Sequence, residues 1–296
     1  MLITLHKPAH LLVGTLVVFA SSAELFAQLP RTGDFDVAYS VVANGHARTA
    51  ASSSTSIVGP ASFGIFLASC LLIAGSTQTF TSTSIPGSGR TTGYGITKFE
   101  FNGDVWHKDV APPAEAPPEA KLNRDFSLDY TITLPTNGPT TSGIEGHAHQ
   151  FLAGFAFDHS LQHYFEIDVG DYMGGRDAKP GYKHTGLLSL IAQRNLRSDG
   201  QSPAHLDFEI DASPSSEGTP ASVVAAPGVT YGFQSGLRLG VAALVGVTAN
   251  DPEIGVSISL KFKGNLAGKG PAKTALTFSR LRRLERLTRF GRFGRF

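Results

Sequence analysis

Residues 205–211 read HLDFEID, and ionisable and bulky apolar side chains alternate along the whole stretch. Successive side chains of a β-strand point to opposite faces. Leu206 and Phe208 therefore share one face, while the carboxylates of Asp207 and Glu209 share the other. Such a strand needs apolar surroundings on one side and polar surroundings on the other.

The same period-2 alternation recurs in five other stretches of the chain, which predicts at least six strands. Less regular stretches raise the expected number to about ten. Short segments rich in Gly, Pro, Asn and Asp separate the strands, and connections this short join antiparallel neighbours. The five further stretches are ITKFEFNGDV, FSLDYTITL, HYFEIDVGDY, GLRLGVAALVGV and EIGVSISLKF, beginning at residues 96, 126, 163, 236 and 253.

The length of these stretches favours a membrane barrel over a soluble sandwich. Several reach about 10 residues, which is what a tilted strand needs to cross a bilayer, whereas soluble strands average about 5 to 6. We therefore predict an all-β fold, an antiparallel up-and-down transmembrane β-barrel of about 10–12 strands with an N-terminal signal peptide. Aromatic residues near strand ends are expected in interfacial girdles: Tyr130, Phe151, Phe157, Tyr164, Tyr172, Tyr231 and Phe262.

In such a barrel the polar strand faces line the lumen, where we place the functional residues. No cofactor is expected. A narrow channel and a purely structural barrel both remain open at this point. The candidate lining residues are Lys98, Glu100, Asp129, Glu166, Asp168, Asp207, Glu209, Arg238 and Lys261.

The chain divides into five predicted segments. Residues 1–27 resemble a secretory signal peptide, with cleavage after Ala27, although an uncleaved anchor is the alternative. Residues 28–48 hold a first strand, 49–93 form an atypical Ser/Thr/Gly-rich segment, and 94–262 form the barrel meander. Within the atypical segment, the uncharged run 57–75 suggests a transmembrane helix that Pro60 and Gly64 weaken. Residues 263–296 are a basic C-terminal extension.

The C-terminal extension carries seven Arg and one Glu between Ser279 and Phe296. An Arg-rich end of this kind can bind nucleic acid or anionic lipid. No nucleic-acid reading module accompanies it, so we expect a solvated extension and no nucleic-acid partner.

The main alternative is a secreted metal-binding β-sandwich or jelly roll built on EGHAHQ, residues 145–150. On a strand, Glu145, His147 and His149 fall on one face at a spacing that can present two imidazoles and a carboxylate to one metal. The stretch resembles the H-x-H of cupins, but the Glu that cupins add a few residues later is missing.

Enzymatic motifs are absent from the sequence. It contains no G-x-S-x-G nucleophile motif, and GSGRTTGYG lacks the Lys-Ser/Thr of a phosphate-binding loop. The single cysteine, Cys70, lies among apolar residues that disfavour a reactive thiolate. Its context LASC fits a lipoprotein box, but far from the N-terminus. We expect a protein that is not an enzyme.

The stretches LDYTITLP, GHAHQFLAGFAF, YFEIDVGDYMGGR, GLLSLIAQRNL and the last hairpin, 236–262, resemble bacterial outer-membrane β-barrel proteins of the putative-transporter type. These are often grouped with proteins of phenol-degradation pathways. The resemblance covers about half of the chain. It implies an outer-membrane location, contact with outer-membrane lipid, and passage of small, aromatic or hydrophobic molecules.

The final strand of that hairpin resembles the closing signal read by the barrel-insertion machinery, here carried by Leu260 and Phe262. Members of the group usually have alternating strands where 49–93 stands and usually end at the closing aromatic. We therefore expect 49–93 and 263–296 to lie outside the barrel, through insertion or a shifted reading frame.

Overall fold

The computed structural model describes residues 32–46, 54–68, 70–85, 89–111, 114, 122–134, 147–176, 179–196, 203–215, 221–233, 236–248 and 254–266. These residues form strands and turns, gathered in one antiparallel sheet. The strands are β1 (Asp34–His46), β2 (Ser54–Ala68), β3 (Leu71–Ile85), β4 (Gly89–Gly93), β5 (Thr97–Val110), β6 (Leu122–Leu134), β7 (Ala148–Asp158), β8 (His163–Arg176), β9 (Lys179–Asn195), β10 (Ala204–Ser213), β11 (Ser222–Gly232), β12 (Leu237–Gly246) and β13 (Ile254–Asn265).

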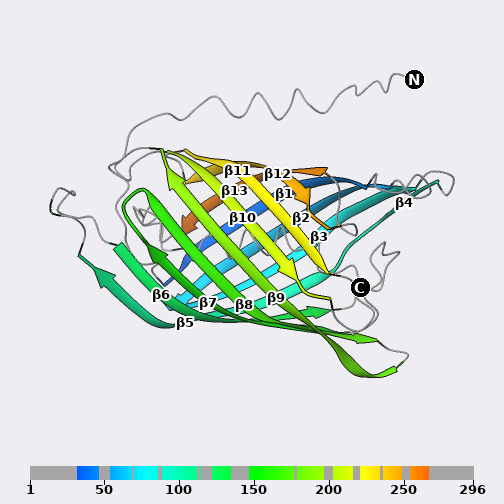
Figure 1. Ribbon diagram of the computed structural model, residues 1–296, viewed down its shortest axis with the longest axis horizontal. Coiled ribbons are helices and arrows are strands. Elements are labelled where there is room, and N and C mark those ends of the chain that lie inside the picture. The colour runs from blue at the N-terminus through cyan, green and yellow to red at the C-terminus, as the bar shows by residue number, and fades with distance from the viewer. Residues whose placement is uncertain are drawn as a thin grey trace.

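The sheet closes on itself as a barrel. From β5 to β13 each strand pairs with the next along the chain, β13 pairs with β1, and β1, β2, β3 and β5 complete the ring. Twelve of the described strands make up this closed wall. The short strand β4 pairs with the end of β3 and extends beyond the wall (Figure 1). The predicted all-β antiparallel up-and-down barrel is confirmed.

The Ser/Thr/Gly-rich segment contributes two full barrel strands, so the expectation that 49–93 lies outside the barrel is wrong. β2 and β3 are 15 residues each and pair along most of their length. The run that suggested a helix, 57–75, is split between them. In the described part of the chain, no helix is long and apolar enough to cross a bilayer.

Pro60 fits this strand because it sits beside an irregularity. The register between β2 and β3 shifts between Gly59 and Pro60. Proline cannot donate to the hydrogen-bond ladder and is found inside sheets mainly at edges or bulges. The residue that argued against a helix is therefore compatible with a barrel strand.

The first and last strands meet over twelve residue pairs, from Asp34 opposite Asn265 to Gly45 opposite Ile254. The side-chain amide of Asn265 donates to Oδ1 of Asp34 at 2.6 Å, although 231 residues separate the two in sequence. β1 lies within the range 28–48 expected for a first strand. The predicted signal peptide, 1–27, lies outside the described residues, as do residues 267–296 of the predicted C-terminal extension. The expectation that 263–296 lies outside the barrel is wrong for 263–265, which belong to β13.

A single closed sheet is not the architecture of a β-sandwich or jelly roll, in which two sheets pack face to face. The sandwich alternative is therefore not supported. The interior holds several small apolar clusters, such as Ala156 with Tyr164 and Ile191, in place of one continuous core. Most of the inner surface is polar.

The closure between β1 and β13 predicts a heat-sensitive mobility on a denaturing gel. We expect unboiled protein to migrate faster than boiled protein, because a closed barrel stays compact in detergent. Val41→Pro, opposite Ile258, removes a ladder hydrogen bond and should abolish the faster band, whereas Val41→Leu should keep it. An unchanged faster band in the proline variant would contradict this closure.

Candidate functional site

The two faces of each barrel strand differ in chemistry. In the stretch HLDFEID, now part of β10, Asp207 is 5% exposed and Phe208 is 43% exposed. In β8 the same contrast separates Asp168, at 0%, from Ile167, at 43%. The carboxylates therefore face the barrel interior and the apolar side chains face outward.

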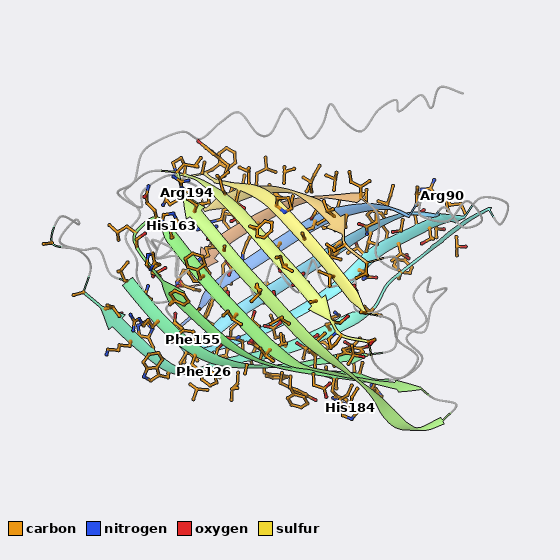
Figure 2. All side chains as sticks on the ribbon, in the orientation of Figure 1. Arg90, Phe126, Phe155, His163, His184 and Arg194 are labelled. Carbon is orange, nitrogen blue, oxygen red and sulfur yellow. The ribbon has the colours of Figure 1, made fainter. Side chains whose placement is uncertain are left out.

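The outward-facing side chains form an apolar surface around the barrel (Figure 2). It includes Phe101 on β5, Leu128 on β6, Phe155 on β7, Val241 on β12 and Ile258 on β13, all exposed. Apolar surface of this extent is unstable in water and matches a lipid environment. The barrel is thus built as a transmembrane barrel of the outer-membrane type.

All nine residues predicted to line the lumen lie on the inward face. Eight are buried, and Arg238, which is half-buried, shares its face with the buried Gly240. Sequence reasoning missed further inward carboxylates, above all Asp36 on β1 and Asp125 on β6. The alternation in DFDVAYSVV could have revealed Asp36, because Val37 and Tyr39 lie on the outer face of the strand and Asp36 lies on the opposite face.

β8, β9 and β10 form the most acidic part of the inner wall, which we call the acidic wall. β8 contributes Glu166 and Asp168, and β10 contributes Asp207, Glu209 and the half-buried Asp211. β9 lies between them and faces inward with uncharged residues: Ser189, Ile191 and Gln193.

Hydrogen bonds hold two of these carboxylates in place. Gln193 Nε2 donates to Asp207 Oδ1 at 2.5 Å, and the hydroxyl of Thr230 on β11 donates to Asp207 Oδ2 at 2.6 Å. The hydroxyl of Tyr164 donates to Glu166 Oε2 at 2.6 Å. These hydrogen bonds hold the two carboxylates in fixed orientations.

The positive side chains gather in a different part of the wall, which we call the basic sector. Arg238 on β12 lies opposite Lys261 on β13, and Lys263 on β13 lies opposite Asp36 on β1. Lys98 is separate from them on β5, two residues from Glu100 on the same face. β11, which separates β10 from β12, carries no charged residue along Ser222–Gly232.

The two histidines proposed as metal ligands point away from the lumen. Ala148 and Gln150 face inward, so the alternation places His147 and His149 outside. His149 Nδ1 lies 2.8 Å from the hydroxyl of Tyr130, and the two rings stack. Glu145 lies outside the described residues. Among the residues that are described, no group of three or more His, Cys, Asp and Glu side chains is arranged to hold a metal.

Two of the aromatic residues that were expected in the interfacial girdles lie on the inner face of the barrel. Tyr164 and Tyr172 are buried, because they share the face of Glu166 and Asp168 on β8. The other candidates point outward; Tyr130 contacts Phe151 with ring centroids 4.8 Å apart, and Phe157 contacts Phe165 at 5.5 Å. The girdle prediction is therefore wrong for Tyr164 and Tyr172, since their parity on the strand decides their face.

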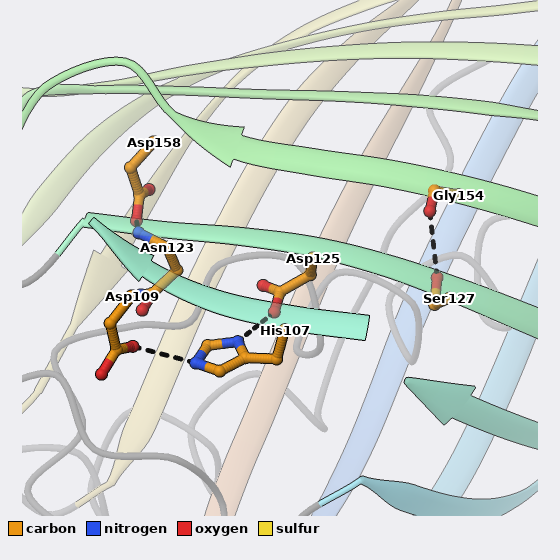
Figure 3. A network of polar contacts seen from close by, with 7 residues as sticks. All are labelled: His107, Asp109, Asn123, Asp125, Ser127, Gly154 and Asp158. Carbon is orange, nitrogen blue, oxygen red and sulfur yellow. Dashed lines mark hydrogen bonds and ion pairs between the residues drawn. The ribbon is translucent and has the colours of Figure 1, made fainter. Parts of the chain in front are cut away.

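A polar network ties the ends of β5, β6 and β7 together (Figure 3). Nδ1 of His107 contacts Asp125 Oδ1, and Nε2 of His107 lies 2.9 Å from Asp109 Oδ1. The backbone N–H of Asn123 donates to Asp158 Oδ2 at 2.8 Å. None of these contacts was expected from sequence, and the one between His107 and Asp125 depends on a register shift in β5 between Asp104 and Trp106.

No known protein-family model matches the sequence, and no curated protein matches it. Among solved structures, the barrel is similar to an outer-membrane channel from Pseudomonas putida F1, with a TM-score of 0.57 and 11% sequence identity. The similarity covers 82% of this chain and 100% of that channel. At this identity the comparison shows a shared fold.

Other solved barrels are similar at lower TM-scores, too low for further comparison. Outer-membrane phospholipase A from Escherichia coli gives 0.41 at 12% identity, covering 77% of this chain and 92% of that one. A TodX deltaS2S3 mutant, a monoaromatic hydrocarbon channel, gives 0.38 at 10% identity, covering 80% and 91%.

The outward face predicts a depth-dependent cost for charge. Ile167→Arg places a cation on the lipid-facing side of β8 and should lower the free energy of unfolding in lipid vesicles by about 2–4 kcal/mol. Val247→Arg, just beyond the end of β12, is the matched control and should cost about 0–1 kcal/mol. Equal costs at both sites would contradict the assigned lipid-facing band.

The bond from Thr230 to Asp207 predicts a coupled effect on stability. Thr230→Val keeps the shape of the side chain but removes one donor from a buried carboxylate, so it should lower the free energy of unfolding by about 1–3 kcal/mol. In an Asp207→Leu background the same substitution should cost close to nothing. Chemical denaturation of all four proteins measures the coupling, and equal costs in both backgrounds would refute it.

Proposed function

We propose that this protein is a narrow outer-membrane channel for small molecules. The observation that carries the proposal is the closed barrel with charged side chains facing inward and apolar side chains facing outward. A charged interior is costly unless it is paired or hydrated, and a hydrated interior crossing a membrane is a route for solutes. The fold shared with an outer-membrane channel supports this reading.

The lumen restricts the solutes to small ones. Barrel diameter grows with strand number, and porins that leave wide aqueous channels have 16–18 strands. This wall has twelve described strands, and side chains such as Glu166 and Asp168 are almost completely enclosed by their neighbours. The resemblance to phenol-degradation barrels favours small aromatic molecules among the candidate solutes.

The same enclosure favours a second candidate, a structural barrel whose side chains close the lumen. In both cases the barrel-insertion machinery would act on the last strand, where Leu260 and Phe262 face outward on β13.

The even number of strands puts both ends of the wall, Asp34 and Asn265, on one side of the membrane. The two-residue connection between β2 and β3 is on that side, and short turns are typical of the periplasmic side.

Solute flux separates the two candidates. Liposomes containing the full mature chain should admit monosaccharide-sized solutes, and small aromatic ones such as benzyltrimethylammonium, much faster than trisaccharides. Ala156→Trp adds a large side chain to the inner face of β7 and should reduce entry of all of them. Ala153→Trp, on the outer face of the same strand, is the matched control. Flux no faster than in empty liposomes, with a correctly folded barrel, would reject the channel.

A further inference from the structure

The inner wall carries a large excess of negative charge. In the described part of the chain, eight carboxylates are buried on it, and two ammonium groups, Lys98 and Lys261, are buried with them. The half-buried Arg238 and Lys263 reduce the excess but leave it negative. The eight carboxylates are those of Asp36, Glu100, Asp125, Asp129, Glu166, Asp168, Asp207 and Glu209.

The excess is not spread evenly around the ring. The acidic wall of β8–β10 presents carboxylates on both sides of β9: Glu166 and Glu209 flank Ile191, and Asp168 and Asp211 flank Ser189. Strands are spaced about 4.7–4.9 Å apart, so flanking residues are separated by about 10 Å of wall. One inward side chain of β9 lies between the two carboxylates of each pair.

Ser189, which lies between Asp168 and Asp211, has unused hydrogen-bonding capacity. Ser189 is 5% exposed, and its hydroxyl has no hydrogen-bond partner among the described residues. A buried hydroxyl without a partner is unfavourable, and such groups are usually satisfied by a bound species or by water. Its oxygen can coordinate a cation that the two carboxylates attract.

The basic sector lies on strands other than those of the acidic wall. Arg238, Lys261 and Lys263 lie on β12 and β13, and the uncharged strand β11 separates them from β10. Charges lining a passage with low-dielectric walls focus the field and raise the local concentration of counter-ions. Carboxylates in excess therefore attract cations and repel anions.

We propose that the lumen selects small cations over anions, and that the acidic wall, with Asp168, Ser189 and Asp211 at its centre, carries the selectivity. The proposal rests on the channel function proposed above and adds the charge of its substrate class. It also predicts that an aromatic solute of this channel is cationic or neutral, not anionic.

The test is the reversal potential of the full mature protein in a planar bilayer under a tenfold KCl gradient at neutral pH. We expect a K⁺ to Cl⁻ permeability ratio on the order of 10 or more. Conductance with no ion preference, or with a preference for Cl⁻, would overturn the selectivity but leave the channel standing. Absence of any conductance would reject the channel and the selectivity with it.

Three variants assign the effect to the proposed residues. Asp168→Asn combined with Asp211→Asn should lower the permeability ratio several-fold, and Lys98→Gln should raise it. Gln150→Asn, an uncharged inward residue on β7, is the matched control and should leave it unchanged. Each variant must show the faster unboiled band; if the double variant does not, Asp168→Asn alone replaces it. A folded acidic-wall variant with the wild-type ratio would refute the assignment.

Discussion

The backbone of a strand in lipid can satisfy its N–H and C=O groups only through neighbouring strands, because the hydrocarbon offers no partner. The sheet must therefore close, and every strand of this wall depends on the one contact that joins its ends, between β1 and β13. This constraint also explains why β2 and β3 belong to the barrel. Without them β1 and β5 would each present an open edge to lipid, and an open edge cannot persist there.

The period-2 alternation was easiest to recognise in strands whose two faces differ most in polarity. Where bulky apolar residues alternate with charges, as in Leu206 and Asp207, the strand, its face and its environment all follow from a period of two. In β2 and β3 the inward positions hold small residues such as Ser62, Gly64 and Ala74, which resemble the residues of a loosely packed helix. The alternation is present there, but low polarity contrast hid it.

Strand register limited the prediction of the site more than composition did. Thr230 and Gln193 are far apart in sequence. Both contact Asp207 in the lumen because β9, β10 and β11 are aligned in one register. Nothing local specifies that alignment. The network around His107 depends on a bulge, which a strict alternation pattern excludes. Candidate lining residues could be named from sequence, whereas their partners could not.

Face assignment also decides which chemistry a motif can perform. The spacing of His147 and His149 suits a metal site, and on the inner wall the same pair would face carboxylates. Ala148 at full burial fixes the parity of β7, so His149 instead meets Tyr130 on the lipid-facing side. A shift of one residue in this strand would move the imidazoles inward and bring Phe151 and Phe155 with them. Placing those two rings against the charged groups of the interior would be unfavourable, and this cost fixes the register of β7. The same cost keeps the aromatic exterior separate from the acidic interior.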